Sequence, residues 1–262
     1  MEEDKISLPT KSNGEIDFNY MEKFIEQIEN ERWNYLDQFF DDAGLQNSIL
    51  TLKENSAIRD FCNNKIPFKI FKLVDVLTVK NTHSILKTDI EYNSGNDPYV
   101  TASEENNSVV TFISYNKDVI EEGNSIMIGG KTLTITYQSK DYYSNDSHNL
   151  ALYLKTDKHR TENIQLFLVS ALKNCLRNTY SWNDSISFKK IQKDEIGLPV
   201  ASSGDIDYEF MENFISAYKK KTIQNLYKWR AQEQINHSIF KLEQTLPKEP
   251  IKIAADKKAS FK

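Results

Sequence analysis

The sequence predicts an α+β protein: one mixed α/β domain flanked by two long amphipathic helices that pack as an antiparallel coiled coil. Three observations predict this fold. A 20-residue motif occurs twice, 190 residues apart, and each copy leads into apolar residues at helical spacing. Between the copies, short alternating apolar runs separated by Asn, Gly and Asp are typical of strands and turns.

The repeated motif reads ISLPTKSNGEIDFNYMEKFI over 6–25 and IGLPVASSGDIDYEFMENFI over 196–215, with 11 of 20 positions identical and no gap. This period is far too long for a solenoid, so we interpret the motif as one connector used twice around a separate domain. The predicted divisions are an extended segment and turn over 1–16, a first connector helix over 17–44, a central domain over 45–195, a second connector with a long helix over 196–245, and an irregular tail over 246–262.

Each copy of the connector contains residues that favour an extended segment, then a turn, then the start of a helix. The Leu-Pro pair favours extended backbone, the glycine that follows favours a turn, and Asp17 or Asp207 stands where a helix N-cap belongs. Apolar residues then follow on one helix face. We expect this face to pack the two helices on each other or to dock a partner, through Phe18, Met21, Phe24, Ile25, Trp33, Tyr208, Met211, Phe214, Ile215 and Leu226.

The central segment begins with a predicted helix over 45–65, with Ile49, Leu52 and Phe61 on its inner side. A second helix is predicted over 162–178. Cys62 and Cys175 are interpreted as small core residues. Strands are predicted over 68–79, 98–102, 108–113, 125–130, 132–138 and 151–156.

Composition sets broad limits on the class of protein. The chain has 262 residues, 39% apolar and 27% charged, which is a globular profile. It holds no apolar run long enough to span a membrane, and its acidic N-terminus does not resemble a signal peptide. Two cysteines suit a reducing compartment. We therefore expect a cytoplasmic protein with no membrane partner.

The formal net charge of −5 hides an uneven distribution. Residues 1–45 hold twelve acids and four bases, and residues 89–122 hold eight acids and one base. Residues 131–193 hold ten bases and five acids, and residues 217–262 hold eleven bases and four acids. Such asymmetry indicates either an anionic partner for part of the surface or simply a mixed solvated surface.

Catalytic motifs are incomplete. The segment 125–132 resembles a phosphate-binding loop, but Ser125 replaces the first glycine and a strand pattern follows where a helix is required. The segment 96–99 lacks one proline of the Asp-Pro-Pro-Tyr loop of amino-methyltransferases. The four histidines have no metal-ligand spacing. We expect no catalytic residue, no metal and no cofactor on this chain.

The sequence resembles the DNA specificity (S) subunits of type I restriction–modification systems and their type IIB relatives, over nearly all of residues 5–230. The connector string, seen twice, is the most specific signal. The other matching segments are 68–73, 98–103 with Asn106 and Asn107, 142–146 and 166–168. Ser108 stands where many relatives have glycine.

This resemblance implies a target recognition domain (TRD) that reads one half of a split site in double-stranded DNA. It also implies connector helices that dock methyltransferase subunits, which carry the S-adenosylmethionine, and indirectly a restriction or motor subunit. Full members usually carry two TRDs, whereas one lies between the connectors here. We therefore expect a half-sized or truncated, non-catalytic subunit that forms a homodimer and reads an interrupted palindrome.

Base contacts require polar side chains on loops, and phosphate contacts require Lys, Arg and hydroxyl groups. Aromatic residues near these loops, including Trp182, could stack on bases or fill the edge of the core. The candidate DNA-binding residues are Thr101, Ser103, Asn106, Asn107, Lys131, Thr132, Lys140, Tyr142, Tyr143, Ser144, Tyr180, Lys189 and Lys190.

Two other functions stay open from the sequence. One is an S-like assembly or anti-restriction factor that occupies partner subunits without reading DNA. The other is an enzyme that modifies DNA itself, which the incomplete cofactor motifs disfavour.

Overall fold

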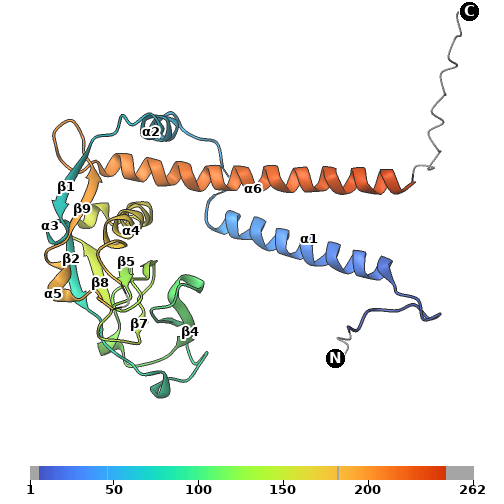
Figure 1. Ribbon diagram of the computed structural model, residues 1–262, viewed down its shortest axis with the longest axis horizontal. Helices are drawn as coiled ribbons and strands as arrows, with labels where there is room; N and C mark the ends of the chain where they lie inside the picture. The colour runs from blue at the N-terminus through green and yellow to red at the C-terminus, as the bar shows by residue number, and fades with distance from the viewer. Residues whose placement is uncertain (1–5, 46, 182, 246–262) are drawn as a thin grey trace, which may run out of the picture. The chain divides into compact units, whose positions relative to one another are not determined.

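The computed structural model describes residues 6–45, 47–181 and 183–245 (Figure 1). The predicted mixture of helices and short strands is confirmed. The chain forms two compact units, one from residues 1–48 with 221–262 and the other from residues 49–220. None of the helices in the described ranges is long and apolar enough to cross a membrane.

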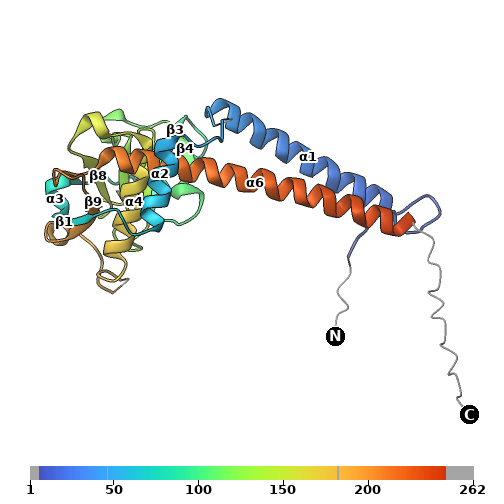
Figure 2. The same cartoon turned by 90° about the horizontal axis from the view of Figure 1, so that it is seen from above.

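The first unit consists of helix α1 (Phe18–Asp42) and the later part of helix α6 (Tyr208–Thr245). The two run antiparallel, because the end of α1 contacts the middle of α6 and its beginning contacts the end of α6 (Figure 2). Asp37 accepts a hydrogen bond of 2.8 Å from the Tyr227 hydroxyl, and Lys241 pairs with Glu26 at 2.9 Å. A regular coiled coil along these helices stays a prediction.

An aromatic cluster holds the middle of this helix pair. The rings of Trp33 and Trp229 lie 6.0 Å apart. The Arg230 guanidinium lies 4.5 Å from the Trp33 ring and 3.3 Å from the Asp37 carboxylate, so one cation contacts both an aromatic face and an acid.

The second unit contains three sheets. A four-stranded antiparallel sheet has the order β2-β8-β5-β6, and a three-stranded sheet has the order β4-β3-β7, in which β3 and β7 are parallel. The antiparallel pair β1-β9 forms the third. The strands are β1 (Phe68–Lys72), β2 (Leu77–Asn81), β3 (Asp97–Val100), β4 (Val109–Ile113), β5 (Ser125–Ile128), β6 (Ile135–Gln138), β7 (Tyr143–Ser144), β8 (Leu150–Leu154) and β9 (Glu195–Pro199).

The main core lies between the four-stranded sheet, helix α4 (Glu162–Leu176) and the start of α6. Thr161 caps α4, and the helix buries Ile164, Leu168 and Leu172. Three shorter helices complete the unit: α2 (Leu52–Cys62), α3 (Leu73–Val76) and α5 (Phe188–Ile191).

Two local predictions were wrong. The predicted strand 68–79 is interrupted by helix α3, which buries Leu73 and Val76 at a spacing of three residues. The inner face expected for the helix predicted over 45–65 is largely exposed. Helix α2 starts only at Leu52, which is 87% exposed, and the helix buries Ala57 and Ile58 instead. A capping box between Thr51 and Glu54 sets this start, so Ile49 lies before the helix and not on a face of it.

The expected packing of the two apolar helix stripes on each other was wrong for part of the stripes, although Trp33 does lie against Trp229 of α6. Met211 and Phe214 are buried in the core of the second unit, whereas Phe18, Phe24 and Ile25 are about half exposed or more. The reason is that the second connector begins as strand β9, which pairs with β1 and brings the first turns of α6 onto α4. The second unit therefore extends to residue 220, beyond the boundary expected at 195.

The remaining predicted packing residues, Met21, Trp33, Tyr208, Ile215 and Leu226, are partly buried. The two cysteines differ in their surroundings. Cys175 packs against the main core, and burial raises the pKa of its thiol to about 11. Cys62 is exposed, so its interpretation as a core residue was wrong.

Candidate nucleic-acid interface

The polar loop 101–108 connects β3 to β4 and is closed by its own backbone. The amide of Thr101 donates to the carbonyl of Ser108 at 2.9 Å. Asn106, Asn107 and Ser108 have φ values of 46°, 51° and 69°, in the left-handed region that favours glycine and tolerates asparagine. Asn107 donates its side-chain amide to the carbonyl of Tyr137 at 2.8 Å. This bond holds the loop against β6.

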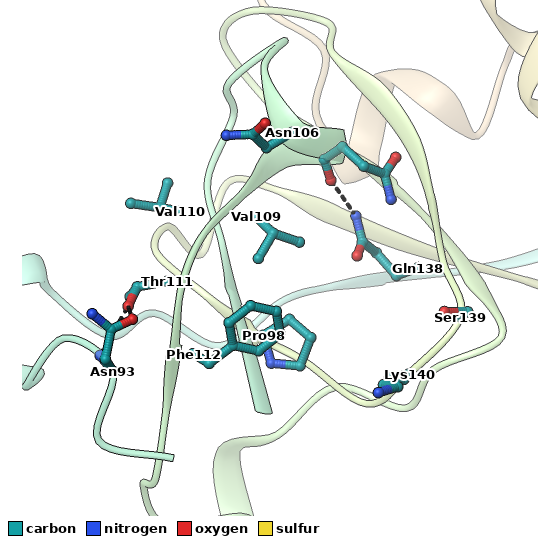
Figure 3. A pocket seen from close by; sticks show the side chains of 11 residues that line it. Asn93, Pro98, Asn106, Val109, Val110, Thr111, Phe112, Gln138, Ser139 and Lys140 are labelled. Atoms are coloured by element: carbon teal, nitrogen blue, oxygen red, sulfur yellow. Dashed lines mark hydrogen bonds between the residues drawn. The ribbon is translucent and has the colours of Figure 1, made fainter. Parts of the chain in front are cut away.

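A groove of about 510 Å³ opens between this loop, β4 and the end of β6. Figure 3 shows the rings of Pro98 and Phe112 beside each other in the groove, with Asn93 on one side and Gln138 on the other. The lining residues are Asn93, Pro98, Asn106, Asn107, Val109, Val110, Thr111, Phe112, Gln138, Ser139 and Lys140.

Hydrogen bonds fix the groove walls before any ligand binds. The Thr111 hydroxyl accepts a bond of 3.0 Å from the Asn93 amide, and Gln138 donates its side-chain amide to the carbonyl of Asn107 at 3.0 Å. The exposed side chains of Asn106 and Lys140 complete the polar lining. Side-chain amides, hydroxyls and one ammonium group around an apolar floor are the groups that hydrogen-bond and stack on nucleic-acid bases.

The turn 129–134 lies beside the same loop. The Thr134 hydroxyl donates to the carbonyl of Ala102 at 3.4 Å and bonds the Thr132 hydroxyl at 2.8 Å. On its other side, the amide of Gly130 donates to the side-chain oxygen of Asn149 at 3.1 Å. The turn therefore links loop 101–108 to loop 144–149, and it carries the exposed Lys131.

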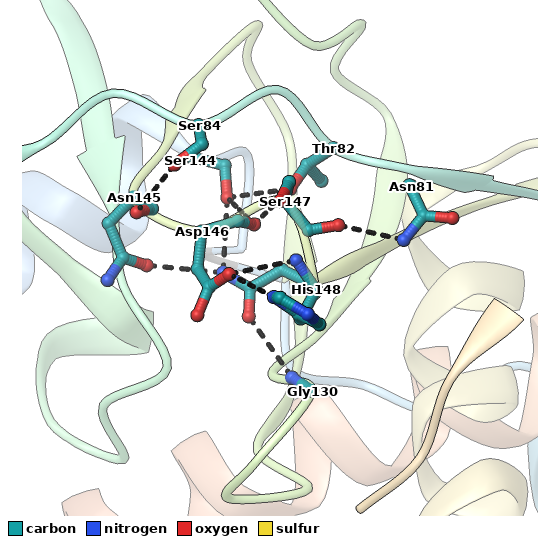
Figure 4. A network of polar contacts seen from close by, with 10 residues as sticks. Asn81, Thr82, Ser84, Gly130, Ser144, Asn145, Asp146, Ser147 and His148 are labelled. Atoms are coloured by element: carbon teal, nitrogen blue, oxygen red, sulfur yellow. Dashed lines mark hydrogen bonds and ion pairs between the residues drawn. The ribbon is translucent and has the colours of Figure 1, made fainter.

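Loop 144–149 is held by a polar network (Figure 4). Thr82 donates its hydroxyl proton to Ser144 Oγ (2.9 Å) or to the carbonyl of Asp146 (2.8 Å). Asn149 donates to Ser144 Oγ at 3.1 Å. The Asp146 carboxylate receives the His148 backbone amide at 2.9 Å and lies 2.8 Å from the His148 ring nitrogen. The His148 imidazole remains exposed.

The electrostatics of this loop favour an ionised Asp146. Partial burial on its own would raise the pKa of this carboxyl group. The hydrogen bonds from His148 and the positive charges of His148 and Lys131 outweigh burial, so the pKa is lowered. The carboxylate therefore acts as a fixed acceptor that orients the His148 ring.

Six of the predicted DNA-binding residues lie in this arrangement of adjoining loops. They come from three stretches that are well separated in sequence, and each has at least part of its side chain exposed. They are Ser103, Asn106, Asn107, Lys131, Thr132 and Lys140.

Five other predictions need correction because the side chains are buried. Thr101, Tyr142, Tyr143, Ser144 and Tyr180 are each exposed by 9% or less. Tyr142 and Tyr143 support the loops from beneath, and neither ring can stack on a base without leaving the core. Tyr180 donates its hydroxyl to Asp194 at 2.6 Å. Trp182 lies outside the described residues.

Lys189 and Lys190 lie on α5, at the opposite end of the second unit from β4 in Figure 1. The Lys190 ammonium pairs with Asp184 and donates to the carbonyl of Ser185 at 2.8 Å, whereas Lys189 is exposed. The structure therefore does not bring these two lysines to the three loops.

Several residues of the interface escaped the sequence prediction. Asn93 belongs to a stretch whose charge pattern indicates only an acidic surface, and the alternating pattern over 132–138 indicates only that Gln138 ends a strand. The signal that could have found loop 144–149 is compositional: all six residues are polar, which is typical of a surface loop that can carry binding residues.

One group of possible metal ligands occurs in the described ranges, Glu22, Glu26 and His237 on the helix pair. The Lys241 ammonium pairs with both carboxylates, at 3.2 Å and 2.9 Å. A cation therefore already neutralises this acidic group, and we assign it no metal.

A substitution at Gly130 tests the link between the loops. A Cβ at Gly130 would overlap the carbonyl of His148, so we expect Gly130→Ala to lower the free energy of unfolding by about 1–3 kcal/mol. Chemical denaturation measures this. Gly197→Ala is the matched control, because its Cβ would meet Ile70 at an ordinary 3.6 Å. Equal stability of both variants would contradict the link.

Comparison with known proteins identifies the family of this chain. The model of the "Type I restriction modification DNA specificity domain" matches residues 65–228. The chain is 24% identical over 225 residues to the type II restriction enzyme BgcI specificity subunit S.BcgI of Heyndrickxia coagulans, covering 84% of this chain and 59% of that protein. It thus spans about three fifths of that relative's length.

Solved structures give similar matches. The S subunit of the type I restriction–modification system from M. genitalium matches with a TM-score of 0.47 and 14% identity, over 88% of this chain and 60% of that one. The HsdS subunit from Thermoanaerobacter tengcongensis matches with a TM-score of 0.46 and 15% identity, over 86% and 55%. The family match over residues 65–228 covers more than half of the sequence, and on that ground the chain belongs to the type I restriction–modification DNA specificity domain family.

Proposed function

We propose that this chain is a non-catalytic DNA specificity subunit whose central domain reads one half of a bipartite site in duplex DNA. The main support is the groove lined by side-chain amides, because it lies on a domain that belongs to the DNA specificity domain family. Asn106 supplies an amide that can pair with the edge of an adenine, and the apolar groove floor suits a thymine methyl group.

Phosphate contacts are assigned to the lysines that border the same surface. Lys140 lies at the groove, and Lys131 lies on the neighbouring turn. Both lysine side chains are exposed. Ammonium groups that replace condensed counterions make DNA affinity depend on salt, so these two lysines set affinity and Asn106 sets sequence preference.

Two groove variants separate these roles. Lys140→Gln is expected to weaken binding to all DNA sequences alike and to reduce the slope of log K against log salt by about one. Aspartate at position 106 tolerates the left-handed backbone, but it replaces an amide donor with a negative charge. We therefore expect Asn106→Asp to change the difference in binding free energy between the preferred base and the other bases by about 1–3 kcal/mol. Fluorescence anisotropy with a randomised duplex library measures both effects.

Lys189→Gln serves as the matched control in this assay, because Lys189 is an exposed lysine on α5 away from the groove. We expect it to leave affinity and salt slope unchanged. A loss of affinity in Lys189→Gln together with unchanged binding in Lys140→Gln would move the interface to α5. A chain that binds no duplex DNA, alone or with partners, would favour an assembly factor instead.

The exposed faces of the helix pair are proposed to dock methyltransferase subunits, which would supply the S-adenosylmethionine and the methyl transfer and would link the chain to a restriction subunit. Support comes from the large apolar side chains that stay exposed on these helices, among them Tyr35, Phe39, Ile239 and Phe240. Co-sedimentation with a purified methyltransferase subunit of a type I restriction–modification system tests docking. Tyr35→Asp with Phe39→Asp should abolish it.

A homodimer is proposed as the state that completes a bipartite reader. Two copies related by a two-fold axis present two identical domains and therefore read an interrupted palindrome. Sedimentation equilibrium measures the mass, and methylation mapping of the intact system measures the motif. A monomeric mass together with an asymmetric motif would contradict the homodimer.

A further inference from the structure

A second cavity, of about 470 Å³, lies in the second unit away from the groove, and we call it the β1 cleft. Its walls are strand β1, the short 3₁₀ turn Asp157–His159 that follows β8, and the connector turn 200–207 between β9 and α6. Strand β1 lies on the opposite side of the second unit from β4 in Figures 1 and 2. The two cavities share none of their described lining residues, so the β1 cleft is a separate site.

Backbone hydrogen bonds fix two walls of the β1 cleft. In the 3₁₀ turn, the amide of His159 donates to the carbonyl of Thr156 at 2.9 Å. In the connector turn, the amide of Gly204 donates to the carbonyl of Ala201 at 2.9 Å. Gly204 has a φ of 85°, in the region that glycine adopts without strain. The walls are therefore formed before any ligand binds.

Aromatic rings hold two basic side chains of the cleft in place. The His159 imidazole stacks on the Tyr208 ring, with the centroids 4.1 Å apart and the planes 13° apart. Lys69 and Phe71 are two residues apart on β1 and so share a face of the strand. The Lys69 ammonium lies 5.4 Å from the centre of the Phe71 ring. A contact with a ring holds a cation without cancelling its charge, so this charge stays available to an anion.

Basic side chains outnumber acidic ones along the cleft. The basic residues are Lys69, Lys158 and His159, and the acid among the lining residues is Asp205. Both lysines are exposed, so their ammonium groups reach the opening of the cleft without leaving the core. The balance of charge therefore favours an anionic ligand.

The groove explains only part of the basic stretch 131–193. The groove and its neighbouring turn use Lys131 and Lys140. Lys158 belongs to the same stretch but lines the β1 cleft. Asp157, the acid beside it in the sequence, pairs with Arg160 at 3.6 Å. This part of the stretch is therefore suited to an anion of its own.

We propose that the β1 cleft binds the phosphate group of a nucleotide. Lys69, Lys158 and His159 contact the phosphate oxygens, and the rings of Phe71 and Tyr208 border the attached sugar. Lysine binds phosphate as a point charge, and a cavity of about 470 Å³ lies in the size range of small-ligand sites. Such a phosphate has two sources, a free nucleotide and the backbone of DNA. The proposal does not depend on DNA reading by the groove.

NMR titration of the full chain, with isotope-labelled histidine, tests the proposal. The signals of the four histidine rings are followed while dAMP is added, and in a second titration while a short DNA duplex of mixed sequence is added. We expect the His159 signal to shift until it saturates. A shift with dAMP alone assigns the site to a free nucleotide, and a shift with the duplex, with or without one by dAMP, assigns it to the DNA backbone. No shift with either probe would overturn the proposal.

Two double variants of equal charge show which residues hold the phosphate. Lys69→Gln with Lys158→Gln should weaken the binding seen at His159 by at least about tenfold, because two charged donors are lost. Lys65→Gln with Lys72→Gln is the matched control and should keep the affinity, because these two lysines are exposed but do not line the cleft. Equal affinity in the two double variants, whether kept or lost, would overturn the proposal.

Lys140→Gln separates the β1 cleft from the groove. Lys140 lines the groove, so this variant should leave the shift of the His159 signal unchanged with both probes. Loss of the shift in Lys140→Gln would place the ligand in the groove and would also overturn the proposal. A chain that fails to read DNA through the groove would still show the shift with dAMP, so failure of the proposed function would not mimic failure of this site.

Discussion

Glu54→Gln is expected to lower the free energy of unfolding of the second unit by about 3 kcal/mol at pH 7. Glu54 lies in the first turn of α2 and is 4% exposed. Its carboxylate accepts hydrogen bonds from the Ser216 hydroxyl at 2.5 Å, from the Lys220 ammonium at 2.9 Å and from the Thr51 amide at 2.7 Å. It thereby ties α2 to α6. A glutamine there leaves the largely buried Lys220 without its counter-charge.

The pH dependence follows from the same contacts. Burial would raise the pKa of Glu54, but the hydrogen bonds and the charge of Lys220 outweigh it and lower the pKa from 4.5 to about 2. A lowered folded-state pKa stabilises the fold above pH 4.5, and this stability is lost as the pH falls through about 2. The difference between wild type and Glu54→Gln should therefore shrink between pH 4.5 and 2.

Urea denaturation at a series of pH values measures this difference. Glu209→Gln is the control, because the Glu209–Lys53 pair is exposed to solvent and such pairs contribute little. A constant difference across the whole pH range would show that Glu54 acts through packing rather than through its charge.

The sequence predicted the parts of the fold that depend on a repeated or strongly periodic pattern. The connector turns and their aspartate caps follow from Leu-Pro, glycine and Asp at fixed offsets, and the structure has both. The single strand predicted over 68–79 failed because Leu73 and Val76 are three residues apart within a run that also alternates. A short apolar run fits a strand or a helical turn equally well.

Side-chain burial near the interface could not be predicted, because it depends on contacts between residues far apart in sequence. Tyr142 and Tyr143 stand in a polar stretch, but β7 pairs with β3 and carries Tyr143 into the core. The groove similarly requires Asn107 and Gln138 to meet, and nothing local to either residue indicates that they do. Polar residue types alone identified the loops, but the packing decides which side chains are free to contact DNA.

The burial of the two connector stripes differs more than any sequence signal suggested, and a pair of substitutions measures the difference. Phe214 is 9% exposed and packs among the rings of Phe61, Phe167 and Phe210, so Phe214→Ala is expected to cost about 4 kcal/mol of unfolding free energy. Phe24 occupies the equivalent position but is 49% exposed, and its described ring contact is with Tyr20 at 6.2 Å. Phe24→Ala should therefore cost less than about 1 kcal/mol in the isolated chain.

Thermal and chemical denaturation of both variants, side by side, decides the point. The two positions share residue type, helix position and neighbouring sequence, so helix propensity is the same for both and only burial differs. Equal losses would mean that residues 6–25 are covered in solution by something within the chain. A large loss of unfolding free energy in Phe214→Ala, with almost none in Phe24→Ala, would show that the apolar face around Phe24 does not stabilise the folded chain. That face would then serve to bind another molecule.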